Sequence, residues 1–438
     1  MKEQFLHFIW QYQRFNHRNL QTTCEKDIEI ISTGSLNLGS GPDFLNAKIK
    51  IDGVLWVGHV EIHVRSSDWI KHKHSSDKNY KNVILHVVYF DDTPIVEELF
   101  PTLVLAGLIP KTIYDRYLGL MESKDILPCQ HLISEIESER IQMYMNRLAA
   151  ERLEMKVSKI SKLLESFDSD FNQVAFVWLA RYFGLGSNSD AFQELASRIP
   201  INWLAKIQHE PEGITALLLG SAGFLDESDT NDHYIHELRE QFSHYKHKWH
   251  LQTFATPWWN WKEGRPPSFP ILKLAQLAKL LENTTSIFQL VLDKDEFVKK
   301  IESIQLHEFW NTHYHLNKES SYKEKHLSSN FAERLLINVT VPMLVCYGRY
   351  LDDYNLTEKA MEILENLPAE KNKITNKMQA SGLPNGHALD SQALIHLKNE
   401  YCDKKRCLEC QIGNQIMRVN ARKLKEPDFL QRFVSYYI

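Results

Sequence analysis

The sequence predicts an α+β protein, in which a small mixed-sheet α/β domain at the N-terminus precedes a large all-α region. Residues 27–90 carry alternating runs of β-branched residues separated by glycines, which is the pattern of strands. From residue 134 onward, apolar residues recur at the spacing of amphipathic helices. We therefore expect an α/β domain over residues 1–125 and a helical region over residues 130–438, divided by the acidic, proline-containing segment 122–129.

Turn signals divide the first domain into its expected elements. An amphipathic helix over residues 3–14 opens the chain. Strands are expected at residues 27–31, 44–51, 54–64 and 83–90, with a further strand at 103–106 and a helix at 111–120. Asp52-Gly53 separates the second and third strands and predicts a tight hairpin, because glycine accepts the positive φ of such a turn. These two strands should therefore pair antiparallel.

The larger region is predicted to consist of helices. One long charged helix is expected over residues 134–167, where apolar residues mark a single face. Shorter helices are expected at residues 171–182, 189–197, 212–219, 232–247, 269–281, 356–364 and 391–401. No fixed repeat period connects these segments.

The composition is that of an ordinary globular protein, with 43% hydrophobic and 24% charged residues. The formal net charge of -5 provides no global basic field, so a nucleic-acid partner would have to meet a local patch. The N-terminal residues lack the uninterrupted apolar core of a signal peptide. No run of apolar residues approaches the roughly 18 that are needed to span a bilayer. We therefore expect a cytoplasmic protein without a membrane partner.

Acidic and imidazole side chains gather at the second and third expected strands. Asp43 precedes the second strand, and His59, Glu61 and His63 share one face of the third, because alternate side chains of a strand point the same way. A hard divalent cation needs converging carboxylate oxygens, and hydrolysis needs a nearby group that handles the proton of water. Asp43 and Glu61 meet the first need and His63 the second. The sequence thus predicts a catalytic site that holds Mg²⁺ or Mn²⁺.

More candidate side chains follow the third strand. Asp68, His72 and His74 lie just downstream of it, and His86 lies inside the apolar fourth strand, where we favour a buried, hydrogen-bonded histidine. Imidazole also suits Zn²⁺ or Fe²⁺. An alternative transition-metal site would therefore use His59, His63, His72, His74 and His86. Charged residues alternate on many surface strands without any function, which is the plain alternative to both sites.

Three cysteines near the C-terminus have the spacing of metal ligands. Cys402, Cys407 and Cys410 form a C-x4-C-x2-C pattern, and the last pair has the gap that is common in zinc and iron–sulfur sites. We therefore expect Zn²⁺ or an iron–sulfur cluster here. A fourth ligand is missing locally, and the candidates are His396, Cys129 and Cys346. The alternative is three reduced cysteines that pack a terminal turn.

The first domain resembles the core of the PD-(D/E)xK nucleases, which has a restriction-endonuclease-like fold. The resemblance rests on Pro42-Asp43 before one strand and on the acidic-x-basic triplet Glu61-Ile62-His63 in its antiparallel partner. It implies that Asp43, Glu61 and the backbone carbonyl of Ile62 hold Mg²⁺ in a nuclease-like phosphodiesterase, a hydrolase acting on nucleic acid. The basic residue of that family is usually lysine, so the alternative is a catalytically inactive scaffold that binds nucleic acid or protein and holds a structural metal.

Motifs along nearly the whole chain resemble those of the bacterial family called domain of unknown function 2851. They comprise residues 41–44, 60–63, 67–69, 85–88, 216–223, 265–270, 275–277, 390–394 and 407–414. The family name implies no activity. The resemblance therefore predicts membership of the family, and the function rests on the residues themselves.

Overall fold

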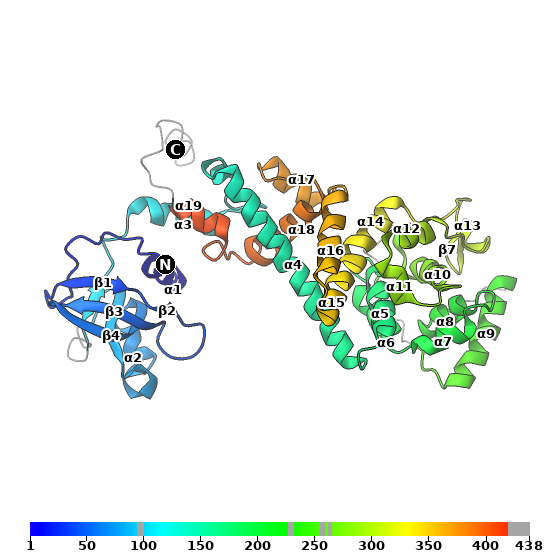
Figure 1. The fold of residues 1–438 in the computed structure, drawn as a ribbon, viewed down its shortest axis with the longest axis horizontal. Helices are drawn as coiled ribbons and strands as arrows, with labels where there is room; N and C mark the ends of the chain where they lie inside the picture. The colour runs from blue at the N-terminus through cyan, green and yellow to red at the C-terminus, as the bar shows by residue number, and fades with distance from the viewer. Residues whose placement is uncertain (94–99, 227–231, 254–258, 262–264, 419–438) are drawn as a thin grey trace. The chain divides into compact units, whose positions relative to one another are not determined.

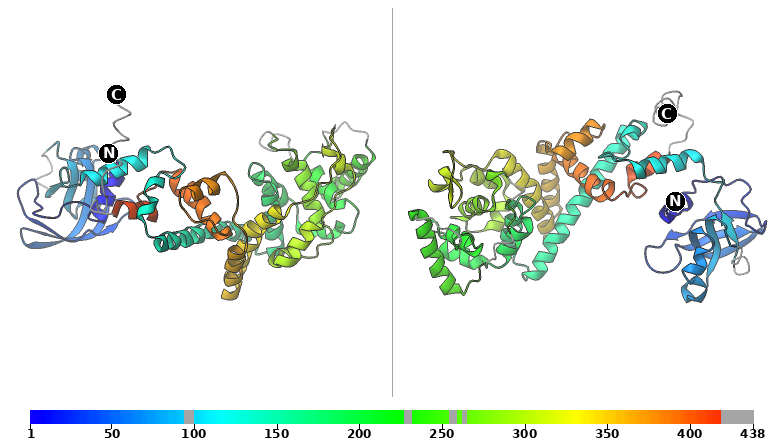
Figure 2. Two further views of the ribbon diagram at one scale, coloured as in Figure 1. Left: turned by 90° about the horizontal axis from the view of Figure 1, so that it is seen from above. Right: turned by 180° about the vertical axis from the view of Figure 1, so that it is seen from behind.

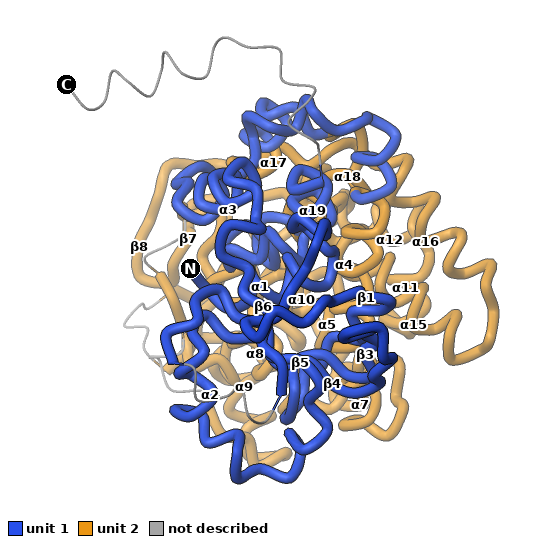
Figure 3. Tube along the Cα trace, turned by 90° about the vertical axis from the view of Figure 1, so that its left-hand side faces the viewer, with its two compact units in different colours: residues 1–144, 376–383, 397–438 blue, residues 145–375, 384–396 orange. Residues whose placement is uncertain are grey.

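The computed structural model divides into two compact units (Figures 1 and 3). It describes residues 1–93, 100–226, 232–253, 259–261 and 265–418. Unit 1 comprises residues 1–144, 376–383 and 397–438, and unit 2 comprises residues 145–375 and 384–396. Unit 1 contains a mixed sheet and unit 2 is largely helical, which confirms the predicted α+β class. The predicted division near residues 125–130 stays a prediction.

The sheet of unit 1 has six strands among the described residues, in the order β1-β3-β4-β5-β6, with β2 paired to β3. The strands are β1 (Ile28–Ser32), β2 (Ser35–Leu36), β3 (Phe44–Ile51), β4 (Val54–Arg65), β5 (Val83–Phe90) and β6 (Thr102–Val104). β1, β3 and β4 pair antiparallel, whereas β4, β5 and β6 pair parallel. All the predicted strands are confirmed, and the short edge strand β2 is additional.

One tight turn and one glycine within the strand determine how β4 meets its neighbours. The β3–β4 hairpin closes through Asp52 and Gly53, both with positive φ, as predicted. Gly58 lies where the start of β5 approaches β4, and a Cβ atom there would meet the Asn82 carbonyl oxygen at 2.6 Å. The half of β4 before Gly58 is exposed and the half after it is buried. Of the candidate catalytic residues, Glu61 and His63 lie on this buried half, and Asp43 directly precedes β3.

Helices α1 (Glu3–Gln11), α2 (Asp68–Lys71), α3 (Lys111–Glu122) and α19 (Gln411–Arg418) belong to unit 1, with the 3₁₀ turns η1 (His74–Ser76), η2 (Lys78–Tyr80) and η4 (Gln130–Glu135). α1 contacts β4 and stacks Phe5 on Tyr117 of α3 at 4.3 Å. α19 lies beside α3, although the two are far apart in sequence (Figures 1 and 2). Arg116 of α3 joins them by donating to the Ile416 carbonyl oxygen at 2.5 Å.

Helices make up most of unit 2, and two more helices, α4 and α17, cross the boundary between the units. In chain order the helices are α4 (Ser138–Ser166), α5 (Phe171–Phe183), α6 (Ser189–Ser197), α7 (Ile201–Ile207), α8 (Gly213–Ser221), α9 (His233–Trp249), α10 (Pro270–Leu281), α11 (Ile287–Leu292), α12 (Lys294–Glu302), α13 (Phe309–Thr312), α14 (Ser329–Leu335), α15 (Val341–Leu351), α16 (Tyr354–Asn366), α17 (Lys373–Ala380) and α18 (Ala388–His396). A small hairpin, β7 (His313–His315) with β8 (Lys318–Glu319), interrupts them.

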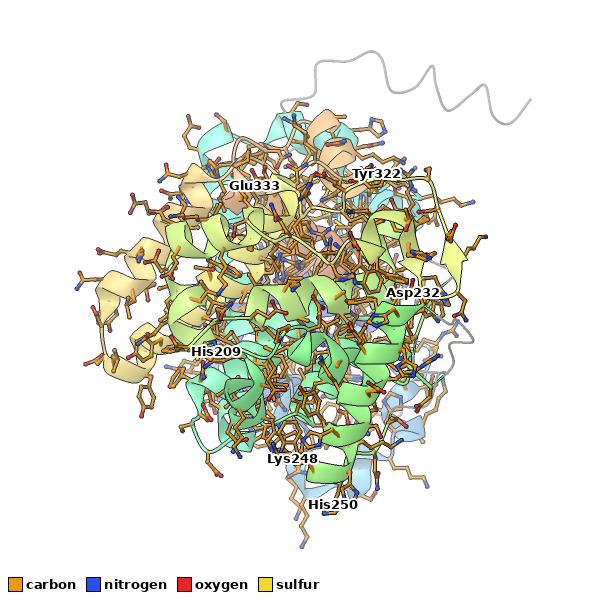
Figure 4. All side chains as sticks on the ribbon, turned by 90° about the vertical axis from the view of Figure 1, so that its right-hand side faces the viewer. His209, Asp232, Lys248, His250, Tyr322 and Glu333 are labelled. Carbon is orange, nitrogen blue, oxygen red and sulfur yellow. The ribbon has the colours of Figure 1, made fainter. Side chains whose placement is uncertain are left out.

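The ends of α9 illustrate how side chains and backbone conformation stop a helix. Asp232 accepts a hydrogen bond from the backbone N–H of Tyr234 at 2.9 Å at the N-terminal end. His250 ends the helix in the left-handed conformation, with φ 52° (Figure 4). The predicted helix at 232–247 is therefore confirmed within two residues at each end.

One helical segment is long and apolar enough to cross a bilayer by length and composition alone. It runs from Ser329 to Leu351 and combines α14, a π-helical turn and α15. Its most apolar window is 78% buried inside the structure. A buried core helix of this kind passes the same test, so the segment is weak support for a membrane span.

Candidate metal centre

Asp43 and Glu61 lie side by side where β3 begins on β4. Phe44 pairs with Val60, which brings the residues that flank this pair together. The Glu61 Oε2 atom accepts a hydrogen bond from the backbone N–H of Asp43 at 3.1 Å. The Asp43 Oδ2 atom accepts one from the backbone N–H of Ile62 at 2.9 Å. The two carboxyl groups that were predicted to hold a cation therefore lie close together where β3 begins beside β4.

Three histidine rings gather beside Glu61. The Glu61 Oε1 atom lies 3.4 Å from His63 Nε2 and 3.3 Å from His74 Nε2. His72 Nδ1 lies 3.2 Å from the same nitrogen of His63. Lys73 has φ 60°, and this left-handed turn reverses the chain between the two histidines of the loop. One ring nitrogen from each of the three histidines lies within 4.8 Å of the other two, which is a spacing that can hold a metal ion.

A buried layer behind the rings holds them in place. His63 Nδ1 lies 2.9 Å from Nε2 of His86, which is fully buried, as we favoured from its apolar strand. When His63 Nδ1 carries the proton and donates it to His86 Nε2, the Nε2 lone pair of His63 is free to face the cluster. Tyr80 stacks on His74 at 3.9 Å, and Trp69 packs edge-on against His74 at 5.3 Å. This layer fixes the ring orientations before any ligand arrives.

Burial sets the charge of the cluster. Glu61 is 4% exposed, and desolvation, followed by the nearby charge of Asp43, raises its pKa to about 9. His63 is 1% exposed, and desolvation, followed by the neighbouring His86, lowers its pKa to about 2. The pKa of His74 is lowered by burial and then by His72. Neutral imidazole is the form that binds metals, and a cation would favour the ionised form of Glu61.

Three buried ring nitrogens of this centre have no hydrogen bond among the described residues, although polar atoms lie close by. These are Nε2 of His7, Nε2 of His74 and Nδ1 of His86. A buried polar atom without a partner costs free energy, and a metal ligand is one of the ordinary explanations for it. The nitrogens of His63, His72 and His74 therefore fit a divalent cation, and Glu61 Oε1 lies within 3.4 Å of two of these rings.

Helix α1 contributes a residue that the sequence reasoning did not identify. His7 Nε2 lies 3.2 Å from Asp43 Oδ2. Glu3, one turn earlier on the same helix, has a raised pKa because of burial and then the charge of Asp43. The available signal was the spacing of Glu3 and His7, which lie four positions apart on an amphipathic helix and therefore share one face.

A model of one protein family matches residues 3–373, which is most of the chain. The chain belongs to the family described as "Protein of unknown function (DUF2851)". The matched range includes the whole metal centre and Cys129, and it ends before Cys402. No curated protein and no solved structure matches the chain.

Two predicted supporting residues make other contacts in this DUF2851 member. His59 Nδ1 accepts a hydrogen bond from the backbone N–H of Asn46 at 3.3 Å. Asp68 accepts one from the backbone N–H of Arg65 at 3.1 Å and pairs with Lys71 at 2.6 Å. Both therefore shape the ends of the loops and strands around the centre, and neither joins the three-histidine group.

The C-terminal cysteines lie apart from this centre, in a second cluster of unit 1. Cys402, Cys407 and Cys410 are buried, and Cys129 lines the same small cavity. The other two candidates for a fourth ligand lie in unit 2. His396 Nε2 lies 3.2 Å from Glu151 Oε2, and the Cys346 sulfur lies 3.9 Å from Ser161 Oγ. Of the three candidates, the fold brings Cys129 to the cluster.

Proposed function

We propose that unit 1 is a metal-dependent phosphodiesterase of the nuclease type. The observation that carries this proposal is the convergence of Asp43 and Glu61 with His63 and His74 at the start of β3. The order of elements also supports it, because an antiparallel hairpin is followed by a short helix and a parallel strand, as in the nuclease core that the sequence resembles. A donor set of carboxylates and imidazoles favours Mn²⁺ over Mg²⁺, since Mg²⁺ takes oxygen ligands.

Each residue has a part in this proposal. Asp43 and Glu61 hold the cation, and His63 and His74 complete its ligands. When bound, the cation supplies a Lewis acid for water and for a phosphate oxygen. His7 orients Asp43 through their 3.2 Å contact. His72 is the exposed member of the group, so its ring can exchange protons with solvent.

Exposed lysines support a phosphate-bearing substrate. They lie on the loop that carries the histidines, and they are Lys71, Lys73, Lys78 and Lys81. Lys71 and Lys73 alternate with His72 and His74 along the chain, and Lys71 pairs with Asp68 at 2.6 Å. Phosphate backbones bind to such local basic patches even when the protein is acidic overall. Nucleic acid is therefore the proposed substrate class.

The test is cleavage of end-labelled single-stranded and double-stranded DNA and RNA by the full chain, with Mn²⁺, Mg²⁺, Zn²⁺ or a chelator. We expect cleavage that requires Mn²⁺ and falls at least about 100-fold in Asp43→Asn and Glu61→Gln, because each substitution removes a charged ligand. Glu29→Gln is the matched control, since Glu29 is an exposed glutamate on β1 that pairs with Lys50. Cleavage that survives both site substitutions, or no cleavage with any metal, overturns the proposal.

His63 favours a second candidate function, a non-catalytic scaffold with a bound metal. The nuclease family places a lysine at this position, whereas the buried imidazole of His63 is neutral because burial lowers its pKa to about 2. A neutral ring cannot stabilise the charge that develops on phosphate as a lysine does. Mn²⁺ or Zn²⁺ binding that Glu61→Gln abolishes, together with nucleic-acid binding and no cleavage, would establish the scaffold.

A further inference from the structure

Four cysteines from two distant segments meet in unit 1. Cys129 lies between α3 and η4, and Cys402, Cys407 and Cys410 lie just before α19. All four are buried, and none of the four forms a disulfide in the described part of the chain. The small cavity between them is otherwise lined mainly by apolar residues, which include Leu120, Leu127, Pro128 and Leu397. Such a gathering of thiols in an apolar environment has no role in the proposed hydrolysis.

Burial favours the neutral, protonated form of the clustered thiols. Burial and then the neighbouring thiols raise the pKa of Cys129 and of Cys402 well above the ordinary range. Burial and then Cys410 raise the pKa of Cys407 to about 11. The neighbouring thiols thus oppose one another's ionisation. The positive charge of Lys405 lowers the pKa of Cys407 and offsets part of the effect of Cys410.

The backbone around the cysteines is shaped for close approach. Gly413 of α19 lies against the turn at Cys407, and a Cβ atom at this position would meet the Cys407 carbonyl oxygen at 2.1 Å. Lys405 has φ 53°, which turns the chain between Cys402 and Cys407. Its ammonium group donates to the carbonyl oxygen of Ser123, close in sequence to Cys129. The two segments are therefore held together at the cysteines.

The spacing of the sulfurs distinguishes between metal centres. Among the described residues, the three histidines of the metal centre are the group whose ligand atoms lie within 4.8 Å of one another, and no three of these cysteines do so. A single Zn²⁺ with Zn–S bonds of about 2.3 Å would hold its four sulfurs about 3.8 Å apart. In a four-iron cluster each thiolate binds a different iron atom, so the sulfurs lie further apart.

We propose that Cys129, Cys402, Cys407 and Cys410 ligate a [4Fe–4S] cluster, which fastens the C-terminal segment of unit 1 to the segment between α3 and η4. The C-x4-C-x2-C spacing supplies three ligands from one turn, and Cys129 supplies the fourth. The apolar lining shields the cluster from water. This role is structural, and it does not depend on the proposed nuclease activity.

The test is to purify the full chain without oxygen and to measure iron, acid-labile sulfide and zinc. We expect about four iron and four sulfide per chain, with broad visible absorption that bleaches on reduction. Protein that arrives partly loaded is reconstituted with iron and sulfide before the measurement. One zinc per chain without iron, failure to take up iron, or a disulfide among the four cysteines found by mass spectrometry would each overturn the proposal.

Single Cys→Ser substitutions then identify the ligands. Cys129→Ser is the decisive variant, because Cys129 comes from the other segment, and we expect it to lose at least half of the iron and the visible absorption. Cys346→Ser is the matched control, since Cys346 is also buried but lies in unit 2 beside Ser161. Equal iron content in Cys129→Ser, in Cys346→Ser and in the unsubstituted chain would exclude Cys129 as a ligand, whatever the folding of the other variants.

Discussion

Burial decides what the side chains of the metal centre can do. Glu61 and His63 would form an acid–base pair on an exposed strand, but both are almost completely inaccessible to solvent here. Burial favours the neutral form of each group, so the pair carries little charge at pH 7 without a cation. Neutral imidazoles beside a carboxyl group that ionises when a cation binds are better suited to hold a metal than to transfer protons. Of the three histidines, His72 is the one that lies exposed to water.

The acidic pair could be predicted from the sequence, because a hairpin and the two-residue period of a strand together fix which residues meet. Asp43 and Glu61 follow directly from Asp52-Gly53 and the two runs that flank it. His7 could not be predicted in the same way, because it reaches Asp43 from α1 and its position depends on how that helix packs against the sheet. Cys129 escaped firm assignment for the same reason.

Lys273 of α10 offers a pH test of burial in unit 2. Its ammonium group is buried, donates to Gln276 Oε1 at 2.8 Å and lies 4.4 Å from the centre of the Phe331 ring. Burial, followed by the charge of Arg334, lowers its pKa from 10.5 to about 8. Between pH 8 and pH 10.5 the unfolded chain therefore binds more protons than the folded chain, so the folded state gains stability as pH rises through this window.

Replacing Lys273 by methionine should remove this gain. We expect the difference in free energy of unfolding, Lys273→Met minus the unsubstituted chain, to be largest at pH 7. This difference should fall by up to about 3 kcal/mol by pH 10, because only the unsubstituted chain gains stability from Lys273. Denaturant unfolding at pH 7, 8.5 and 10 measures this difference, and other titrating groups cancel because both chains contain them. Parallel pH profiles for the two chains would contradict the assignment.

At the scale of elements, the β-branched strands, the longest helices and the short helices α6 and α8 were predictable, whereas α7, α11, α12 and α15 were not. α7, α11 and α12 contain two turns or so each, which is too short for a clear apolar period. α12 is stabilised at its start by Asp293, which accepts hydrogen bonds from the backbone N–H groups of Asp295 and Glu296. Such short helices depend on caps and tertiary contacts more than on their own propensity.

The crossing of α8 and α9 depends on a glycine. A Cβ atom at Gly220 would meet the ring of Phe242 at 2.1 Å, because the two helices pack closely at this point. Both residues are buried, so the ring has little space to move away. We expect Gly220→Ala to destabilise the fold by about 1–3 kcal/mol through overpacking, despite the higher helix propensity of alanine. The midpoint of denaturant unfolding measures the change.

Gly119 of α3 provides the matched control, because a Cβ atom there would meet nothing within 4 Å. Gly119→Ala should stabilise the chain by about 0.5–1 kcal/mol through backbone entropy alone. The double variant Gly220→Ala, Phe242→Leu should recover part of the lost stability, since a smaller side chain makes room for the added methyl group. If both glycine substitutions changed stability in the same direction, close approach of α8 and α9 could not be the reason.

At the scale of the whole molecule, the end of the sequence returns to the unit that contains its beginning. Arg116 donates to the carbonyl oxygen of Ile416, which lies 300 positions later, and Lys405 donates to that of Ser123. Ile412 and Ile416 are buried in the same unit. No local pattern in the sequence predicts such a pairing, because periodicity and turn residues carry information only about residues close in sequence. For this reason local patterns do not predict that unit 1 includes residues 376–383 as well as the segment that begins at residue 397.

This return of the chain predicts how truncation affects the two units. Removing residues 397–438 uncovers Leu120 and Leu127, which are otherwise buried, and takes away three of the four clustered cysteines. We expect unit 1 to lose at least about 2 kcal/mol of stability, given the apolar area exposed, while unit 2 keeps its own unfolding transition. Differential scanning calorimetry of the two transitions measures both effects in one experiment. Removing only residues 419–438 is the control, because it leaves all the described contacts of α19 intact. Equal calorimetric profiles for the two truncations would mean that the segment 397–418 contributes nothing to unit 1.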